Sequence, residues 1–254
     1  LGKGLELHYQ PQVSPLGQQV VGCEALIRWM KPHGEMVAPD VFIPLAEYTG
    51  LIVEIGDWVF AEACQQIVRW DKEGLPHFRV GLHISAAQFR EPDFVSKIAG
   101  VIESTGVSPA RLELEITESV AMEDPESVAR QLRELKSLGL RVAVDDFGCG
   151  FSSLGSLNRL PFDRVKIDRA FVRELTPETS QDCIARMIVK LAKSLGLEVT
   201  AEGVETEVQA RLLGEMGCKE MQGFLYGRPM NADALMGWIT ARSLPLGGFP
   251  GVDD

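Results

Sequence analysis

Residues 111–148 read RLELEITESVAMEDPESVARQLRELKSLGLRVAVDDFG, and they contain one complete strand–helix–strand unit. Apolar and polar residues alternate over Arg111–Thr117, which predicts a half-buried strand. Apolar residues then recur every three to four positions over Ser127–Leu138, which predicts an amphipathic helix that ends at Gly139. A second strand, Arg141–Asp146, follows at once. This order of elements is typical of α/β proteins.

The same alternation of strands and helices extends along the whole chain. A second helical pattern covers Ile184–Leu195, and glycines at positions 196 and 217 are predicted to end helices. The predicted strands are Leu5–Gln10, Val20–Trp29, Arg79–Ser85, Arg111–Thr117, Arg141–Asp146, Arg164–Asp168, Glu198–Gly203 and Met221–Tyr226.

These elements favour a single TIM-like (β/α)8 barrel over residues 1–242, because neither a break in composition nor a low-complexity linker divides them. An open, doubly wound sheet is the alternative, but the chain contains neither a GxGxxG nor a GxxxxGKS/T phosphate-binding loop. Residues 243–254 have the composition of a flexible C-terminal tail.

Composition excludes several classes of protein. The 254 residues include 36 acidic and 25 basic side chains, a formal net charge of −11, which argues against binding to DNA or RNA. The five cysteines are odd in number and form no CxxC pair, so we expect reduced thiols in a cytoplasmic protein rather than disulfides or a zinc site.

No membrane span is expected within this piece, because the most apolar stretch, Leu51–Cys64, is interrupted by three acids. The chain shows no signal peptide and begins without Met. We therefore expect a module of a longer protein, whose other parts could tether it to the inner membrane.

Side chains two positions apart share a face of a strand, and this rule brings polar residues together. In Arg111–Thr117, Glu113, Glu115 and Thr117 share the face opposite the leucines and isoleucine. In a barrel the apolar face packs against the helices, so the polar face is predicted to point into the lumen. The same rule places in the lumen Glu24 with Arg28, His83 with Ser85, Lys166 with Asp168, and Thr200 with Glu202.

Acidic side chains near the carboxyl ends of these strands are candidate metal ligands. Carboxylates that converge in a semi-enclosed space repel one another and take up protons unless cations neutralise them. Oxygen-ligated divalent ions can do so, and barrel enzymes place their sites at this end. The candidates are Glu24, Glu115, Asp145, Asp146 and Glu202. Asp145 and Asp146 are adjacent, so both reach one centre only if the strand ends there, as the following Phe-Gly-Cys-Gly predicts.

Each of these residues taken alone has a structural explanation. A single Glu in a strand is most often solvated or salt-bridged, and Asp-Asp before a glycine loop is most often part of a turn. Lys166 alone is expected to pair with an acid, and His83 to be a hydrogen-bonded core residue. Arg28 alone is expected to lie at the surface or to stack next to Trp29. The functional interpretation is favoured because five strands place acids or a base on the same face.

Six motifs give the chain a resemblance to a known family. They are EALIRW at 24–29, LELEITES at 112–119, DDFG at 145–148, KIDR at 166–169, AEGVET at 201–206 and QG at 222–223. With these motifs the chain resembles EAL domains, the family of cyclic di-GMP phosphodiesterases. The match extends from YQP at 9–11 to GRP at 227–229. It implies a barrel in which one early strand runs antiparallel to the others, and hydrolysis of cyclic di-GMP to linear pGpG.

The resemblance also implies two divalent metal ions, Mg²⁺ or Mn²⁺, and the residues that hold them. Glu24, Glu115 and Asp145 would hold one ion, and Asp145 would share the second with Asp146. Lys166 and Glu202 would be the catalytic residues, beside the attacking water. Two bound metals of this kind can activate the water and stabilise both the attacking and the leaving oxygen.

Further residues are implied by the resemblance to contact the substrate or to support a loop. Arg28 would bind a substrate phosphate, with Gln10, Asp168 and Gln222 near the guanine or sugar. Glu118 would anchor the loop Phe147–Ser153, which lies near the metal site and the homodimer contact in this family. Glu205 is the second loop-anchoring candidate.

One strand departs from the family pattern. Where the family has Val-Asn-Leu-Ser, this chain has Leu82-His83-Ile84-Ser85, so His83 replaces a metal-binding asparagine. An imidazole nitrogen suits Mn²⁺, Zn²⁺ or Fe²⁺ better than Mg²⁺. The outcome is activity with an altered metal preference, weak activity, or loss of one metal and a pure binding role. Cys149 and Phe151 stand where the family usually has Thr and Tyr; we expect the loss of the hydroxyl at Phe151 to be tolerated and Cys149 to be a bystander rather than a nucleophile.

Three functions remain to be distinguished. A metal-dependent cyclic di-GMP phosphodiesterase is favoured, because every acidic ligand and Lys166 are retained. The competing hypothesis is a catalytically weak or inactive receptor that binds cyclic di-GMP and signals to attached domains, such as GGDEF or sensory domains. A barrel used only for protein contacts is the third, and it leaves the charge cluster unexplained.

Overall fold

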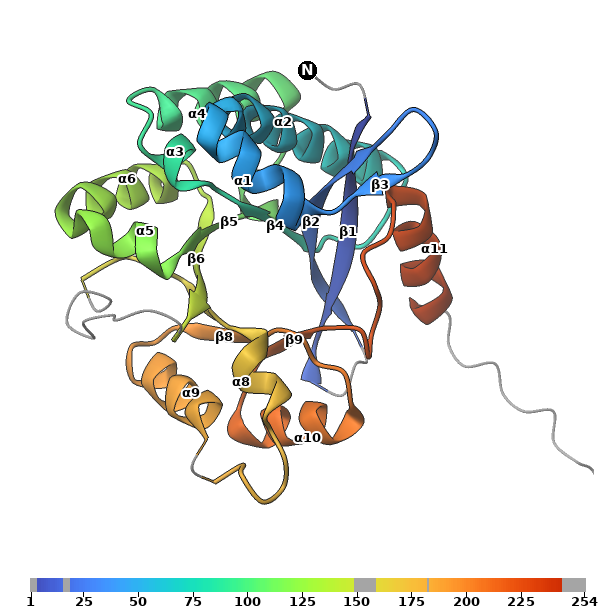
Figure 1. Cartoon of the computed structure of the whole chain (residues 1–254), viewed down its shortest axis with the longest axis vertical. Coiled ribbons are helices and arrows are strands. Elements are labelled where there is room, and N and C mark those ends of the chain that lie inside the picture. The colour runs from blue at the N-terminus through green and yellow to red at the C-terminus, as the bar shows by residue number, and fades with distance from the viewer. Residues whose placement is uncertain (1–3, 16–18, 149–158, 182, 244–254) are drawn as a thin grey trace, which may run out of the picture.

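The computed structural model describes residues 4–15, 19–148, 159–181 and 183–243. A ring of strands lies inside a layer of helices (Figure 1). The strands are β1 (Leu5–Val13), β2 (Val20–Met30), β3 (Met36–Val37), β4 (Arg79–His83), β5 (Leu112–Thr117), β6 (Arg141–Phe147), β7 (Arg164–Ile167), β8 (Glu198–Ala201) and β9 (Glu220–Gln222). The helices are α1 (Pro39–Thr49), α2 (Leu51–Lys72), α3 (Ala86–Phe89), α4 (Phe94–Thr105), the 3-10 turn η2 (Pro109–Arg111), α5 (Glu118–Glu123), α6 (Pro125–Ser137), α8 (Arg169–Arg173), α9 (Ile184–Ser194), α10 (Glu207–Met216) and α11 (Ala232–Ser243).

Of the nine strands, all but β3 close into a barrel, in the order β1-β2-β4-β5-β6-β7-β8-β9. From β2 through β4 to β9 each strand is parallel to the next, whereas β1 is antiparallel to both β2 and β9. The expected TIM-like barrel with one antiparallel early strand is therefore confirmed. The two-residue β3, which the sequence analysis did not predict, pairs with β2 outside the ring.

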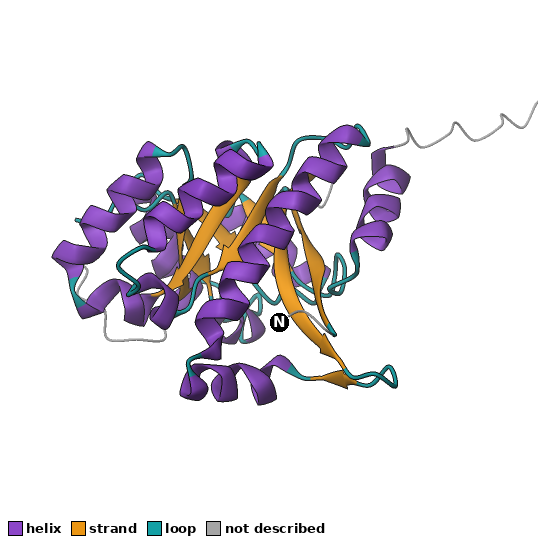
Figure 2. Cartoon of the chain, turned by 90° about the horizontal axis from the view of Figure 1, so that it is seen from above, coloured by secondary structure: helices purple, strands orange, loops and turns teal. Residues whose placement is uncertain are grey.

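Strand alternation builds the core as predicted. Leu112, Leu114 and Ile116 of β5 are at most 1% exposed, because they face the surrounding helices. Figure 2 shows helices flanking the strands on both sides. Helix α6 begins where the Asp124 carboxylate accepts from the backbone N–H of Ser127 at 3.2 Å. It is followed by Gly139 with φ of +93°, the left-handed residue that was expected to end it.

Three strands end two or more residues earlier than predicted. β9 ends at Gln222, because Gly223 packs directly against the backbone of Val204 and the chain turns there. β8 ends at Ala201, so Glu202 lies just beyond the strand. β4 ends at His83, because Ser85 caps α3 by accepting from the backbone N–H of Gln88 at 3.2 Å.

None of the helices in the described part of the chain is both long and apolar enough to cross a membrane. The 22-residue α2 instead packs on the barrel through side chains such as Phe60, Ile67 and Trp70, which are all buried. Of the expected tail, Ser243 ends α11 and residues 244–254 lie outside the described residues. The flexible tail therefore stays a prediction.

Candidate functional site

Two layers of polar side chains fill the lumen, because residues two apart on a strand point inward at successive levels. The lower layer lies toward the amino ends of the parallel strands and the upper layer toward their carboxyl ends. The lower layer consists of Gln12, Arg79, Glu113, Arg164, Thr200 and Glu220. The upper layer consists of Glu24, His83, Glu115, Asp145, Lys166 and Glu202.

The lower layer neutralises its own charges. Arg164 donates to Glu113 (Nε–Oε2 3.1 Å), to Glu220 (Nη2–Oε1 2.9 Å) and to the hydroxyl of Thr200 (2.8 Å). Arg79 pairs with the other oxygen of Glu113 (Nε–Oε1 3.0 Å) and with Glu220. Two arginines therefore face two glutamates, and these charges need no metal ion.

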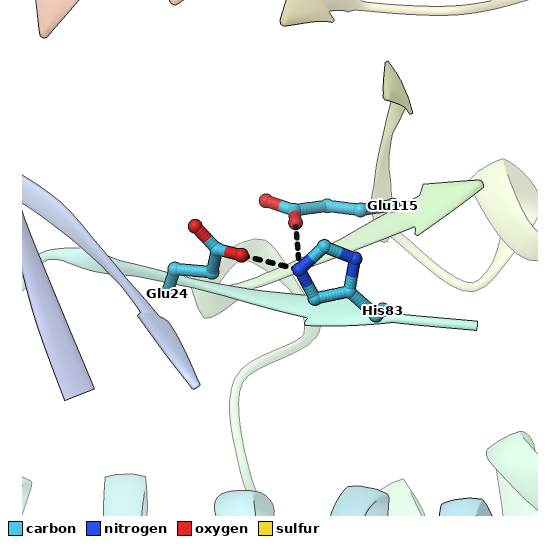
Figure 3. Close-up of side chains that lie close together, drawn as sticks. All are labelled: Glu24, His83 and Glu115. Carbon is cyan, nitrogen blue, oxygen red and sulfur yellow. Dashed lines mark hydrogen bonds and ion pairs between the residues drawn. The ribbon is translucent and has the colours of Figure 1, made fainter. Parts of the chain in front are cut away.

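Three side chains of the upper layer converge on one point (Figure 3). Glu24 comes from β2, His83 from β4 and Glu115 from β5. Nε2 of His83 contacts Oε1 of Glu24 and lies 3.5 Å from Oε2 of Glu115, while Nδ1 lies 3.2 Å from Oδ2 of Asp145. Each of Glu24, His83 and Glu115 offers one ligand atom, and these atoms all lie within 4.8 Å of one another.

Lys166 of β7 lies among the carboxylates of the upper layer. Its Nζ is 2.6 Å from Oε2 of Glu115 and 2.7 Å from Oε1 of Glu202. It is also 3.3 Å from Oδ1 of Asp145 and 3.7 Å from Oε2 of Glu24. Four carboxyl groups thus surround one ammonium and one imidazole, which leaves an excess of acidic groups that the lower layer does not have.

Burial and repulsion alter the ionisation of these acids. Burial raises the pKa of Glu115 to about 7, with Glu24 acting in the same direction and Lys166 opposing it. Burial raises the pKa of Glu202 to about 8, and Asp145 and Glu24 add to the shift. Burial also opposes ionisation of Glu24, but Lys166 and His83 outweigh it and lower its pKa to about 2. Protons therefore neutralise part of the cluster, as expected for converging acids that have too few cations.

The two basic groups keep their charge in these surroundings. Desolvation favours neutral His83, although 44% of its side chain is exposed, but Glu24 and the hydrogen bond to Asp145 outweigh it and raise the pKa of the imidazole well above its ordinary value. Burial likewise opposes the charge on Lys166, and Asp145, Glu115 and Glu202 raise its pKa despite that.

The upper layer fits a divalent cation. Oε1 of Glu115 is buried and has no hydrogen-bond partner among the described residues. It points at Gly81, where an added Cβ would overlap it, so the carboxylate uses the space that this glycine leaves. Leaving a buried acceptor unsatisfied is costly, and a metal ion would relieve that cost. Carboxylate oxygens with one imidazole are a suitable donor set for Mn²⁺ and, with weaker preference, Mg²⁺.

The adjacent aspartates lie in different surroundings. Asp145 is 3% exposed and faces His83 and Lys166, whereas Asp146 is exposed. Asp146 has φ of +52° and is the only non-glycine residue with positive φ in the described ranges. The β6–β7 register is irregular between Val144 and Phe147, so Asp146 lies in a bulge. The predicted strand end at Asp146 is therefore wrong, because β6 continues to Phe147 and the left-handed residue re-aims the side chain.

Asp146 and Asp168 lie together at the mouth of the barrel. Burial, Asp145 and a hydrogen bond with Asp168 raise the pKa of Asp146. Asp168 also caps α8, since its Oδ1 accepts from the backbone N–H of Ala170 at 2.8 Å. The structure thus brings Asp168 to the edge of the acidic cluster.

Arg28 lies beside the same cluster. It is half-buried at a cavity of about 330 Å³ whose lining includes His83 and Glu115. Its Nη1 donates to the backbone carbonyl of Ile27 at 2.9 Å, and burial lowers the pKa of the guanidinium while Glu24 opposes that shift. A guanidinium next to a candidate metal site is suited to bind phosphate.

Gln10 and Gln222 are buried and bonded to each other. Nε2 of Gln222 donates to Oε1 of Gln10 at 3.0 Å and also to Glu24. Nε2 of Gln10 donates to the carbonyl of Gly227 at 3.0 Å. Both side chains line a cavity of about 300 Å³ together with Glu24 and Glu202. The contact between Gln222 and a candidate metal ligand was not foreseen from the sequence.

The two loop-anchoring candidates differ. Oε2 of Glu118 accepts from the backbone N–H of Gly148 at 2.8 Å, at the start of the predicted loop. Cys149 and Phe151 lie outside the described residues. Glu205 is exposed, and its backbone N–H donates to Oε1 of Gln209 at 2.9 Å. The anchoring role therefore stays a prediction for both residues.

The pairing of charges within the lower layer was not predicted from the sequence. Arg79 is four residues before His83, and Arg164 is two residues before Lys166. The same alternation rule that placed His83 and Lys166 in the lumen would have placed both arginines there.

Comparison with known proteins gives the family. The EAL domain family matches residues 1–229. The bifunctional diguanylate cyclase/cyclic di-GMP phosphodiesterase MucR of Pseudomonas aeruginosa is 43% identical over 236 residues, which cover 93% of this chain and 34% of that protein. The signalling protein YkoW of Bacillus subtilis is 41% identical over 224 residues, which cover 88% of this chain and 28% of that protein. The chain thus spans about a third of the length of these relatives.

Solved structures agree with this match. The PaMucR phosphodiesterase in its c-di-GMP complex has a TM-score of 0.88 at 42% identity, and the match covers 92% of this chain and 94% of that chain. The EAL domain of Mycobacterium smegmatis DcpA has a TM-score of 0.80 at 34% identity, with 95% of this chain and 100% of that chain covered. The chain belongs to the EAL domain family.

Proposed function

We propose that this chain is a metal-dependent phosphodiesterase that hydrolyses cyclic di-GMP to linear pGpG. The observation that carries the proposal is the excess of acids in the upper layer, where Glu24, Glu115, Asp145 and Glu202 share Lys166 at the carboxyl ends of the strands. Membership of the EAL family and the likeness to a phosphodiesterase solved with c-di-GMP support the choice of substrate.

The proposed metal ligands are divided between two ions, Mg²⁺ or Mn²⁺. Glu24, Glu115, Asp145 and His83 would hold the first, with the imidazole in its neutral form, and Asp145 and Asp146 the second. When bound, such ions supply positive charge near the reacting phosphate and lower the pKa of an attacking water.

Lys166 and Glu202 are the proposed catalytic residues. The Lys166 ammonium would stabilise the negative charge that develops on the phosphate, since its Nζ lies within 4 Å of all four carboxylates of the layer. Oε1 of Glu202, 2.7 Å from that Nζ, would accept the proton of the attacking water when Glu202 is ionised.

The proposed substrate contacts surround this centre. Arg28 would donate to a phosphate oxygen from the cavity it shares with His83. Gln10, Gln222 and Asp168 would contact the guanine or sugar. Because Gln10 and Gln222 already donate to Gly227 and Glu24, their contribution to the substrate would come from atoms that face the 300 Å³ cavity.

One observation favours the alternative function, a cyclic di-GMP receptor with weak or no catalysis. The His83 ring contacts Glu24 and lies 3.2 Å from Asp145, so an imidazolium can neutralise these carboxylates without a metal. Nucleotide would then bind, and hydrolysis would be slow.

Conversion of cyclic di-GMP by the chain with Mg²⁺ or Mn²⁺ tests both functions. Wild type, Glu24→Ala and His83→Asn should be compared, with product identified by chromatography. The phosphodiesterase predicts turnover in wild type, a loss of about a thousandfold or more in Glu24→Ala, and a shift of preference from Mn²⁺ toward Mg²⁺ in His83→Asn.

Other results would point elsewhere. Absence of turnover with either metal, unchanged by Glu24→Ala, rejects the enzyme. Tight nucleotide binding without hydrolysis, in both wild type and His83→Asn, supports the receptor. Undetectable binding of cyclic di-GMP by calorimetry would leave a barrel that serves protein contacts.

The molecular setting is also a proposal. We expect a longer parent protein with GGDEF or sensory domains, since the chain covers only about a third of the length of its curated relatives. A homodimer and a cytoplasmic position for this module complete the proposal. Size-exclusion chromatography with light scattering would test the homodimer.

A further inference from the structure

Two glutamines, Gln12 and Gln222, connect the lower layer to the upper layer; we call this pair the amide bridge. Nη2 of Arg79 donates to Oε1 of Gln12 at 3.3 Å, and Nε2 of Gln12 donates to Oε1 of Gln222 at 2.9 Å. Nε2 of Gln222 in turn donates to Oε2 of Glu24. Gln12 is 1% exposed and Gln222 is 4% exposed, so both amides depend on these partners.

The chemistry of the two ends fixes the orientation of both amides. A guanidinium only donates hydrogen bonds and an ionised carboxylate only accepts them. Gln12 must therefore turn its carbonyl to Arg79 and its amino group to Gln222. Gln222 must then turn its amino group to Glu24, and it donates the second N–H to Oε1 of Gln10 at 3.0 Å.

Strand pairing and a glycine hold the bridge in place. Gln12 is the register partner of Gln222 across β1 and β9, and of Gly22 across β1 and β2. A Cβ at position 22 would lie 2.5 Å from Oε1 of Gln12, so the amide uses the space that this glycine leaves. At the far end Arg79 is itself held by Glu113 and Glu220.

We propose that Gln12 is a positioning residue for the metal site: acting through Gln222, it holds the Glu24 carboxylate with Oε1 turned toward His83. This inference rests on the proposed metal-dependent function and deepens it. Without the Gln12 amide, the buried carbonyl of Gln222 loses its hydrogen-bond donor, and Gln222, held only through its amino group, no longer fixes the position of the Glu24 carboxylate. Removing a hydrogen-bond partner of a metal ligand typically weakens metal affinity by about 10–100-fold.

The test measures Mn²⁺ affinity of the full 254-residue chain from the electron paramagnetic resonance signal of free Mn²⁺. Gln12→Met keeps the length of the side chain and removes its hydrogen bonds, and it is expected to weaken Mn²⁺ binding about tenfold. Thr200→Val is the matched control. Thr200 is a buried lower-layer residue that bonds to Arg164 and Glu220, so its loss should leave the affinity within about twofold of wild type.

A double variant separates positioning from a general loss of packing. In a Gln222→Met background the residue through which Gln12 acts is gone, so adding Gln12→Met should cause no further loss of Mn²⁺ affinity. Gly22→Ala crowds the Gln12 carbonyl and should weaken Mn²⁺ binding in the same direction, which keeps the test valid if Gln12→Met does not fold.

Several results would overturn the proposal. They are wild-type Mn²⁺ affinity in Gln12→Met, an equal loss in Thr200→Val, or additive losses in the double variant. If wild type binds no Mn²⁺, the proposed metal site itself fails and Gln12 has nothing to position. Wild-type binding with an unaffected Gln12→Met removes only the role of Gln12 and leaves the proposed function standing.

Discussion

Glu113 and Glu115 lie two residues apart on β5, point into the same lumen and are both at most 1% exposed. Glu113 faces Arg79 and Arg164, and charges in that layer are matched. Glu115 shares Lys166 with three other acids and shares His83 with two of them. Burial of a glutamate in a barrel therefore does not by itself make a site. The shortage of cations around Glu115 does.

The largest expected effect comes from replacing a glutamate by glutamine in each layer and comparing the two variants. Glu113→Gln should lower the free energy of unfolding by about 3–5 kcal/mol, because it leaves buried Arg79 and Arg164 without part of their counter-charge. Denaturant unfolding of the metal-free chain measures this. Glu62→Gln is the control, since Glu62 pairs with Arg69 at the surface and should cost less than about 1 kcal/mol. Equal costs would contradict the picture of a charge-balanced lower layer.

Glu115→Gln should have little effect on stability and a large effect on metal binding. The pKa of Glu115 is raised to about 7, so this carboxyl already holds a proton much of the time near neutral pH and a neutral amide replaces it at small cost. We expect the free energy of unfolding of the metal-free chain to change by less than about 1 kcal/mol, and Mn²⁺ affinity to fall by about a hundredfold. Calorimetry on both variants checks this, and Glu113→Gln should keep the wild-type affinity. Unchanged Mn²⁺ binding in Glu115→Gln would exclude Glu115 as a ligand.

A smaller expected effect is the release of protons from the upper-layer acids when Mn²⁺ binds. Metal ligands must be deprotonated, so Mn²⁺ binding should release about one more proton at pH 7, where Glu115 and Glu202 are partly protonated, than at pH 9, and the His83 imidazolium adds its own proton to the number released. Titration calorimetry in buffers of different ionisation enthalpy measures the number released. A number that does not vary with pH would show that neither carboxyl titrates on binding.

The sign of the linked stability change follows from the same pKa values. Both carboxyls have folded-state pKa values above the ordinary value of 4.5. Their contribution to the stability of the metal-free fold is therefore complete below about pH 4.5 and is lost as the pH rises through about 7 to 8.

Local patterns predicted a large part of this molecule. Alternation in Arg111–Thr117 correctly placed Glu113 and Glu115 in the lumen and the leucines against the helices. It could not show that the two glutamates have different partners, because this depends on the register of β5 with its neighbours, where His83 pairs with Glu115 and Arg141 with Glu113. Register is set by long-range packing, which a single strand does not encode.

The alternation of apolar and polar residues also could not predict the direction of β1 or the backbone geometry at Asp146. The antiparallel β1 came from family resemblance, since alternation is the same in either direction. The glycines after Asp146 correctly signalled an irregularity, but the structure places it one residue earlier, as a bulge at Asp146 itself. Gln12 shares its face with Gln10, and only the closed barrel shows that it reaches Gln222.

The barrel closes between β1 and β9 through only two residue pairs, Gln12–Gln222 and Val13–Met221, whereas β1 and β2 share nine. This seam is the shorter of the two strand pairings that β1 makes within the barrel. Gln222, which donates the hydrogen bond to Glu24, lies in it. Transient opening of the seam would release the Glu24 carboxylate while the other seven strand pairings of the barrel stay intact. Amide hydrogen exchange at Val13 and Met221 would then report the integrity of the acidic cluster, and an ion bound at Glu24 should slow that exchange.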